Sequence, residues 1–573
     1  MIDLAITKKK QRIFLPEMLD LSKWENIKPY FDDLLERAIE TPAALYNWIL
    51  DRSELEAILS EYSSRIWIRT TCDTNDKEGK ELLEYYFTNI ETELQRNFHK
   101  LNERFIACEH TADLDENMFG LYKKRIQTQM SFFKPENVEL NAQISIKCAK
   151  YGEISAAMTV EIEGQKVTLQ KANSYLKNEN RALREEAFTK VFNRRKEDET
   201  NLNNLFSELL KMRNTVASNA GYDNFRDYMF DELCRFDYNV DDCFKFHDAI
   251  EKNIVPIVEK ILQERKHRLK LTQLRPWDTA ADLPGREPLK PFNDGRDLIN
   301  KTIHCFDKLH PFFATCIKTM DDHKHLDLDS RIGKAPGGYM SPLYETLIPF
   351  IFMNGVGTLK DVVTMVHEGG HAFHEFLTAK YDVTAFKQYP SEIAELASMS
   401  MELLTMDTWD AYFASELDQV RAKKEHLEDV LMALPWIATI DAFQHWIYTN
   451  PYHSIEERSR MWTQIYQRFH PSIVDWSGLE HFENMLWQRQ LHLFECPFYY
   501  IEYGMAQLGA IAIFKNFKTD KTTTLSNYMH ALSLGYTQSI PDVYQTAGIR
   551  FDFSNDYIKA LAQFVEDELA KLN

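Results

Sequence analysis

The sequence predicts a mainly α-helical protein with a small β element, and three observations lead to this prediction. Apolar residues recur three and four positions apart over most of the chain, which is the period of an amphipathic helix. Strand-like patterns occupy only two short stretches, residues 153–169 and 336–355. The 573 residues are 44% hydrophobic, so the chain can bury large cores, and its length favours two or three substructures.

The predicted elements follow one another along the chain. The N-terminal region is helical, as the pattern of residues 24–68 illustrates. Alternating residues around Gly164 predict a β-hairpin within residues 153–169, after which the helical period resumes. Proline, glycine and aspartate crowd residues 275–295, which we expect to form a loop. Short strands with turns are expected over residues 336–355, and helices from there to the C-terminus.

Charge and cysteine usage argue against several classes of protein. Lys and Arg total 67 against 87 Asp and Glu, and the net charge of −20 disfavours a nucleic-acid or anionic-membrane partner. No apolar run approaches the ~18 residues that span a bilayer, and the N-terminus lacks the apolar region of a signal peptide. The eight cysteines are scattered without a C-x-x-C pair. We therefore expect a cytoplasmic protein with reduced thiols.

The stretch VVTMVHEGGHAFHEF places an H-E-x-x-H motif within a predicted helix. Thr358 and Asp361 provide a start that resembles a capping box. His367 and His371 lie four residues apart, so both imidazoles can reach one zinc ion from the same face of the helix. Glu368 would lie beside the ion and act on water rather than bind the metal. An apolar stripe along the same helix disfavours the alternative of an ordinary surface helix.

Two adjacent glycines, Gly369 and Gly370, interrupt this predicted helix. Each interior glycine costs a helix roughly 1 kcal/mol relative to alanine. Because glycine has no side chain, we expect the pair to let another helix or a substrate channel approach closely.

A catalytic zinc site also needs a third protein ligand and an open position for water. The segment YPSEIAELASMSMELL predicts a second helix that carries Glu392, Glu395 and Glu402. Glu395 and Glu402 are seven residues apart on one face of that helix, so one can bind the ion while the other orients a ligand imidazole. Spacing alone leaves Glu392 and Glu395 as alternatives for the metal ligand.

The pair of segments HEGGHAFH and EIAELASMSMELL resembles the zinc peptidases of the thimet oligopeptidase and oligoendopeptidase F family, the second branch most closely. The resemblance is strong over residues 170–515. It implies that Glu395 completes the zinc site of His367 and His371, and that Glu402 supports the site from behind the ligands.

The segment WQRQLHLFECPFYYIEYGMAQLGA is similar to the histidine-and-tyrosines signature of the same family. By this similarity His492, Tyr500 and Tyr503 bind substrate carbonyls and help to stabilise the tetrahedral intermediate. Tyr499 stands next to Tyr500, and we chose Tyr500 as the matching position.

The family fold implies two helical lobes around a deep substrate channel, with the zinc helix on its floor. Such a channel admits short flexible peptides and excludes folded proteins. The segment FMNG corresponds to the edge strand that is expected to pair with the peptide backbone. By this correspondence Asn354 and Gly355 are expected to bind substrate. A glycine-rich loop that matches one closing over substrate contains Gly337, Gly338 and Tyr339.

These observations predict a zinc-dependent oligoendopeptidase with one zinc ion per chain and Glu368 as the general base. We divide the chain into an N-terminal helical region, residues 1–150, and a catalytic region, residues 151–573. The alternatives are a dipeptidyl carboxypeptidase-type exopeptidase, which needs a cation for the substrate carboxylate, and a peptide-binding protein without turnover. Short peptides are the expected partners, with neither nucleic acid nor membrane, and the chain is expected to be a monomer.

Overall fold

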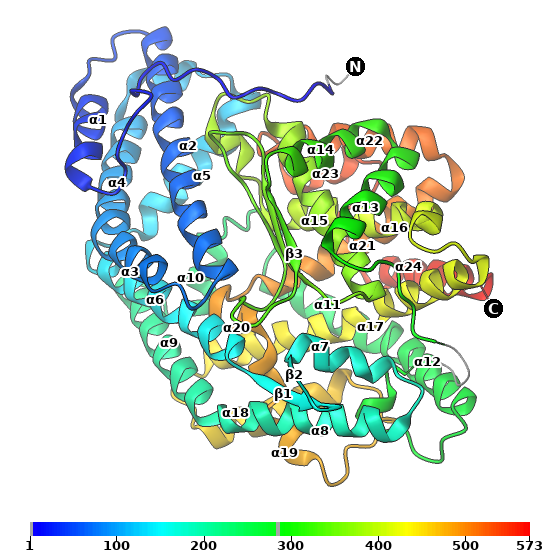
Figure 1. The fold of residues 1–573 in the computed structure, drawn as a ribbon. Coiled ribbons are helices and arrows are strands. Elements are labelled where there is room, and N and C mark those ends of the chain that lie inside the picture. Colours follow the sequence, from blue (N-terminus) through cyan, green and yellow to red (C-terminus); the bar gives the residue numbers. More distant parts are fainter. Residues whose placement is uncertain (1–3, 282–286, 573) are drawn as a thin grey trace.

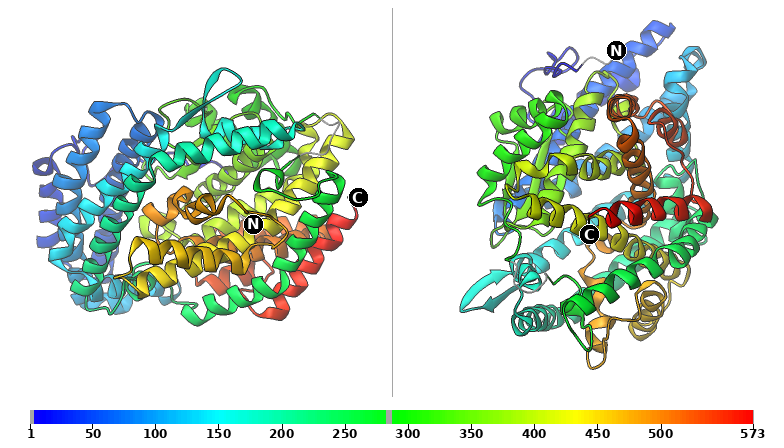
Figure 2. Two further views of the ribbon diagram at one scale, coloured as in Figure 1. Left: turned by 90° about the horizontal axis from the view of Figure 1, so that it is seen from below. Right: turned by 90° about the vertical axis from the view of Figure 1, so that its right-hand side faces the viewer.

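The structure, a computed structural model, describes residues 4–281 and 287–572 and confirms the mainly α-helical fold (Figure 1). The left view of Figure 2 shows the N-terminal helices at one end of the molecule and the C-terminal helix at the opposite end. The helices of the N-terminal region are α1 (Trp24–Glu36), α2 (Pro42–Cys72), α3 (Lys77–Tyr85), α4 (Thr92–Ala107), α5 (Glu116–Phe132) and α6 (Pro135–Ala156).

The remaining helices form two groups along the chain. Before the predicted loop lie α7 (Leu169–Ser174), α8 (Arg181–Glu197), α9 (Glu199–Asn219), α10 (Phe225–Glu232), α11 (Val240–Asn253) and α12 (Val255–Arg268). After it lie α13 (Gly295–Leu309), α14 (Pro311–Asp322), α15 (Leu359–Thr378), α16 (Ser391–Leu404), α17 (Glu416–Thr449), α18 (Ile455–Phe469), α19 (Glu480–Asn484), α20 (Leu491–Glu495), α21 (Tyr500–Thr519), α22 (Lys521–Leu532), α23 (Ile540–Thr546) and α24 (Asn555–Ala570).

The predicted hairpin is present as β1 (Thr159–Ile162) and β2 (Gln165–Thr168), which pair in antiparallel register. Glu163 and Gly164 connect the strands with φ values of 51° and 75°. A two-residue turn with both φ angles positive fits the twist of a hairpin, and glycine adopts such angles without strain. The first residues of the predicted segment instead finish α6, because their apolar positions also fit a helical period.

The predicted loop at residues 275–295 is confirmed in its described part, apart from one short helical turn over residues 276–278. Residues 282–286 of this prediction lie outside the described residues. Just before the loop, Leu274 forms a β-bridge with Val474, and this bridge attaches the start of the loop to the body of the protein.

A three-stranded sheet precedes α15 and consists of β3 (Leu326–Asp329), β4 (Tyr339–Ser341) and β5 (Phe350–Gly355) in the order β3–β5–β4. The expectation that the FMNG segment is an edge strand is wrong, because β5 lies between parallel β3 and antiparallel β4. The sequence LDLD of β3 alternates, but its acidic positions hid it among loop residues. Strands β3 and β4 therefore form the two edges of the sheet.

Among the described residues, three large hydrophobic cores and a small fourth one around Phe350 and Phe352 hold these elements together. One lies among the N-terminal helices and includes Phe386 from the segment after α15, whose ring meets that of Phe119 at 5.1 Å between centroids. A second core is formed by the helices from α6 through α10, by the hairpin, and by the helices from α18 through α20. The largest surrounds α15, α16 and α21. The N-terminal region is thus packed directly on the part of the chain that carries the H-E-x-x-H motif.

Helices α15 and α16 approach each other closely at Gly370. A Cβ atom at this position would lie 2.5 Å from Cα of Ser398. The neighbouring Gly369 lies against the ring of Phe306, which a Cβ atom would meet at 2.9 Å. The prediction that the glycine pair permits a close approach is confirmed, and the approaching element is the helix that carries the candidate glutamates.

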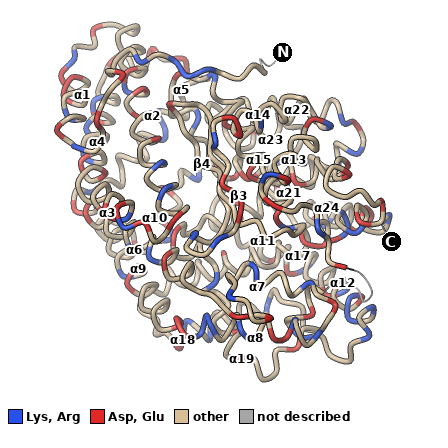
Figure 3. The backbone as a smooth tube through the Cα atoms, in the orientation of Figure 1, with Lys and Arg blue, Asp and Glu red and all other residues tan. Residues whose placement is uncertain are grey.

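Acidic and basic residues are intermixed along most elements, so the net charge of −20 is spread over the molecule (Figure 3). Among the described residues, no helix is both long and apolar enough to cross a bilayer.

Candidate active site

Helix α15 begins with the predicted capping box. The carboxylate of Asp361 accepts hydrogen bonds from the backbone N–H of Thr358 at 2.7 Å and from its hydroxyl at 2.9 Å. This start fixes the end of α15 that follows β5, and both imidazoles of the motif emerge two to three turns later.

The side chains of His367, His371 and Glu395 converge from α15 and α16. Nε2 of His367 lies 3.3 Å from Oε2 of Glu395, and Nε2 of His371 lies 3.5 Å from the same oxygen. One ligand atom from each residue lies within 4.8 Å of the other two. Two imidazole nitrogens with one carboxylate oxygen form the donor set of many catalytic zinc sites, so these residues fit the predicted ion.

Glu402 stands behind the first histidine, as the sequence predicts. Its Oε1 lies 2.6 Å from Nδ1 of His367, which leaves Nε2 of the imidazole directed to the convergence point. Burial alone would lower the pKa of His367, but the carboxylates of Glu395 and Glu402 raise it well above its usual value. The surroundings therefore favour a positive charge at the place where a metal cation would lie.

The two alternatives for the third ligand occupy different environments. Glu395 faces the histidines, whereas Oε1 of Glu392 accepts a hydrogen bond from the Tyr238 hydroxyl at 2.6 Å. The geometry therefore places Glu395, the glutamate that the family resemblance implies, next to the two histidines.

Two further side chains hold Glu395 and escaped the sequence reasoning. Ser398 donates its hydroxyl to Oε2 of Glu395 at 2.9 Å, and Tyr499 donates to Oε1 at 2.5 Å. Ser398 follows Glu395 by three positions on one helix, so that spacing could have identified it. Tyr499 lies in the recognised signature, but nothing in the sequence told its hydroxyl apart from that of Tyr500.

Glu368 lies beside the convergence point and is 5% exposed. Among the described residues its Oε2 atom has no hydrogen-bond partner. Burial raises the pKa of this carboxyl above its usual value. A Cβ atom on Gly338 would lie 3.6 Å from Oε1 of Glu368, so the residues that lead into β4 border this carboxyl.

His492 lies at the start of α20, and Tyr500 and Tyr503 lie at the start of α21. The hydroxyl of Tyr503 lies 3.1 Å from Nε2 of His492, and Nδ1 of this histidine lies 2.8 Å from Nε2 of Gln490. Tyr503 and His492 border the same cavity as the three candidate ligands, whereas Tyr500 borders an adjoining one.

The cavity that contains this constellation has a volume of about 730 Å³. Its lining includes the candidate ligands with Glu368 and, from α2, Trp67 and Thr71. Tyr339, from β4, also lines the cavity, and its hydroxyl lies 2.5 Å from that of Thr71. The N-terminal region therefore forms part of the cavity.

The four residues predicted to contact substrate fall into two pairs. Gly338 and Tyr339 line the cavity, whereas Asn354 and Gly355 are absent from its lining. The Asn354 amide instead donates to the carbonyl groups of residues 335 and 337 at 2.8 and 2.9 Å. Asn354 thus shapes the loop in front of β4, the edge strand that borders Glu368.

His374, one turn beyond the motif, stacks on Tyr389 at 3.4 Å between ring centroids and is fully buried. Burial lowers its pKa well below the usual value of histidine. These contacts make His374 a packing residue rather than a ligand.

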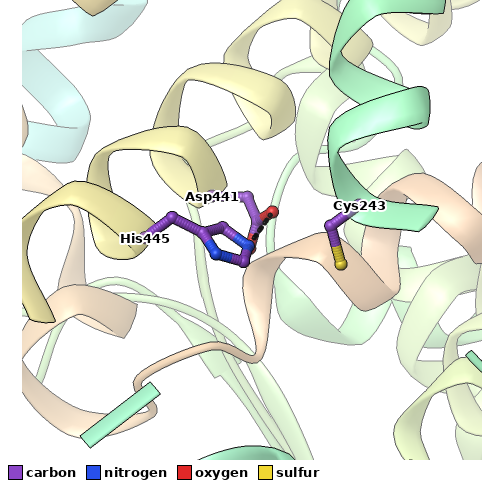
Figure 4. Close-up of side chains that lie close together, drawn as sticks. All are labelled: Cys243, Asp441 and His445. Atoms are coloured by element: carbon purple, nitrogen blue, oxygen red, sulfur yellow. Dashed lines mark ion pairs between the residues drawn. The ribbon is translucent and has the colours of Figure 1, made fainter. Parts of the chain in front are cut away.

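A second group with metal-ligand chemistry lies elsewhere, between α11 and α17, and contains Cys243, Asp441 and His445 (Figure 4). Oδ2 of Asp441 lies 3.2 Å from Nε2 of His445 and 2.8 Å from Nε2 of His247. Burial raises the pKa of the Cys243 thiol well above its usual value. The two imidazoles around one carboxylate link the two helices, and none of these side chains lines the cavity.

Comparisons with known proteins identify the family of this chain. Residues 174–563 match the family described as peptidase family M3, and residues 19–133 match the peptidase M3 N-terminal domain. Chromosomal oligoendopeptidase F of Lactococcus lactis subsp. cremoris is 22% identical over 414 residues, which cover 71% of this chain and 67% of that protein. Oligopeptidase PepF of Bacillus subtilis is 23% identical over 405 residues, which cover 70% of this chain and 58% of that protein.

The solved structure described as Pz peptidase A with an inhibitor is also similar. It superposes with a TM-score of 0.93 at 25% identity and covers 98% of this chain and 99% of its own. The mainly α-helical fold is therefore shared over nearly the whole chain.

Proposed function

The chain belongs to peptidase family M3, in its oligoendopeptidase F branch, and we propose that it is a zinc-dependent oligoendopeptidase that hydrolyses internal bonds of short unfolded peptides. One observation carries the proposal: two imidazole nitrogens and a carboxylate oxygen converge next to a buried glutamate with a free oxygen. A protein that only bound peptides would have no use for that glutamate.

His367, His371 and Glu395 would hold the zinc ion, one per chain. When bound, zinc supplies a Lewis acid that polarises the scissile carbonyl and lowers the pKa of water to about 7. Glu402 holds His367 through Nδ1, while Ser398 and Tyr499 hold both oxygens of Glu395, so little reorganisation is needed on metal binding.

Glu368 is the general base of this proposal. Its free Oε2 accepts a proton from the attacking water and then gives it to the nitrogen of the leaving amine. Burial raises the pKa of this carboxyl, which brings it closer to neutral pH and so suits a group that must both take and release a proton.

Tyr503 and His492 act on the substrate carbonyl. The Tyr503 hydroxyl can donate a hydrogen bond to the oxygen on which negative charge develops, and His492 lies 3.1 Å behind it. Burial lowers the pKa of His492 to about 4, so near neutral pH the imidazole is uncharged and can hydrogen-bond the tyrosine without a full charge. Tyr500 borders the adjoining cavity together with Glu368 and His492, and would also contact substrate.

The size and walls of the cavity support short peptides as substrates. A volume of about 730 Å³ between α2 and the metal-ligand helices accommodates an extended segment of a few residues but no folded domain. The edge strand β4 offers its free backbone groups to such a segment by β-augmentation.

Mass spectrometry of defined peptides of graded length, incubated with zinc-loaded protein, tests the proposal. We expect internal cleavage of the shorter peptides and none of folded proteins. Glu368→Gln should lower turnover by at least 10³-fold, as removal of a general base combined with loss of water activation does, and should keep its zinc. Turnover by this variant at close to the normal rate would contradict the proposed role of Glu368.

A further inference from the structure

Two arginines line the active-site cavity away from the metal-ligand cluster. Arg195 lies in the last turn of α8, and Arg489 lies two residues before α20, which carries His492. Both border the cavity that contains His367 and Tyr503. The side chain of Arg489 is exposed to solvent in this cavity, with protein around it, and the side chain of Arg195 is partly buried.

Neither guanidinium has an acidic partner. Within residues 4–281 and 287–572, no carboxylate forms an ion pair with Arg195 or Arg489, and the groups beside them are neutral tyrosine hydroxyls such as that of Tyr151. By contrast, the buried Arg184 pairs with Asp278 at 2.7 Å. Burial lowers the pKa of both cavity arginines, and the positive charge of Arg489 adds to this effect at Arg195. Two unpaired cations in one cavity create a potential that attracts an anion.

The acids that line the same cavity do not supply this anion. Glu153 is engaged with Lys80 at 3.1 Å. Burial raises the pKa of Glu495 to about 8, so its carboxyl is mostly protonated at neutral pH. The remaining acids of the lining, Glu368 and Glu395, belong to the proposed zinc site.

Arg489 is also held in a binding geometry. Its guanidinium lies over the ring of Trp436 at 4.6 Å from the centroid, which fixes the plane and leaves the N–H edge free. The same tryptophan donates its indole N–H to Gln490 at 3.0 Å, and Gln490 contacts His492 at 2.8 Å. A group bound by Arg489 would therefore be positioned by the same segment that positions His492.

We propose that Arg195 and Arg489 form a subsite for a carboxylate of the peptide substrate. The carboxylate comes either from the C-terminus of the peptide or from an aspartate or glutamate side chain, and a planar guanidinium binds both in the same bidentate manner. A C-terminal carboxylate at this subsite would fix the distance between the cleaved bond and the end of the peptide. The inference rests on the proposed peptidase function of the adjoining cluster.

A matched peptide set tests the subsite. One neutral peptide is prepared with a free acid and with an amide at its C-terminus, and the amide is also prepared with one glutamate at each successive position. Cleavage by wild type, Arg489→Gln, Arg195→Gln and Arg489→Lys is compared as the ratio of kcat/KM between anionic and neutral peptides. Lys80→Gln is the control, because Lys80 lines the same cavity but already has an acidic partner.

We expect wild type and Lys80→Gln to favour one class of anionic peptide by about 10–100-fold, the range of a charge-assisted hydrogen bond. The ratio should fall toward 1 in both glutamine variants and take an intermediate value in Arg489→Lys, which keeps the charge but loses the fork. A preference for the free acid identifies the C-terminus, and a preference for one glutamate position identifies a side chain. A ratio near 1 in wild type, or one unchanged in the glutamine variants, would overturn the proposal.

Binding of the same peptides to Glu368→Gln, measured by fluorescence anisotropy, separates the two proposals. If wild type cleaves none of the peptides, the peptidase function fails, but the anionic preference in binding still tests the subsite. Thermal denaturation of each variant checks that it is folded.

Discussion

The hydroxyl of Tyr499 donates to Glu395 at 2.5 Å, which makes Tyr499 a positioning residue for a proposed metal ligand. Tyr499→Phe removes this bond and should weaken zinc affinity by about 10–100-fold, the usual cost of losing such a support. Tyr500→Phe is a matched control, since among the described residues the hydroxyl that bonds Glu395 is that of Tyr499 and not that of Tyr500, and this variant should keep the wild-type affinity. Competition with a zinc chelator measures both values, and equal affinities would contradict this role.

Glu495, which lines the cavity, makes the stability of the folded protein depend on pH. Burial raises the pKa of its carboxyl to about 8 in the folded protein, whereas an unfolded glutamate titrates near 4.3. Between these values the folded state holds a proton that the unfolded state has lost, so stability falls as pH rises.

Glu495→Gln removes this titration and should therefore be more stable than wild type at pH 8. We expect the difference in unfolding free energy to grow from near zero at about pH 4 to the order of 2 kcal/mol at pH 8, since partial exposure to the cavity reduces the full effect. Urea denaturation across this pH range measures it. Parallel stability profiles for the two proteins would show that Glu495 is not buried as described.

The proposed zinc site depends on the contact between helices α15 and α16. A Cβ atom at Gly370 would lie 2.5 Å from the backbone of Ser398, so Gly370→Ala must push the two helices apart. We expect a loss of several kcal/mol of stability together with weaker zinc binding, measured by thermal denaturation and metal content.

Gly152→Ala is the control for this substitution, because Gly152 also lies in a helix but a Cβ atom there would meet nothing within 4 Å. Alanine at this position should stabilise the protein slightly through its helix propensity. Loss of stability in both variants would mean that the effect at Gly370 is not specific to the contact of α15 with α16.

The sequence predicted elements best where their pattern is local. The capping box of α15, the turn at Gly164 and the helix that carries Glu395 are all present, because each depends on residues a few positions apart. The order of the three strands was not predictable in this way. Strand β3 approaches β5 from more than 20 residues away, and only tertiary pairing decides which strand lies at the edge.

At the scale of the whole molecule, the site depends on contacts that no single segment encodes. The H-E-x-x-H spacing indicated two candidate ligand positions, but spacing left Glu392 and Glu395 open until the fold paired Glu392 with Tyr238. The part that α2 plays in the cavity wall was equally hidden, because Thr71 and Tyr339 are 268 residues apart along the chain. The division of the chain at residue 150 stays a prediction.

The zinc content of two glutamate variants tests the central claim of this account most directly. Glu395→Gln and Glu392→Gln change the same chemical group on the same helix, but only Glu395 faces the two histidines. After zinc loading and dialysis, elemental analysis should find about one zinc per chain in wild type and Glu392→Gln, and almost none in Glu395→Gln. Retention of zinc by Glu395→Gln, or its loss from folded Glu392→Gln alone, would contradict the proposed metal site.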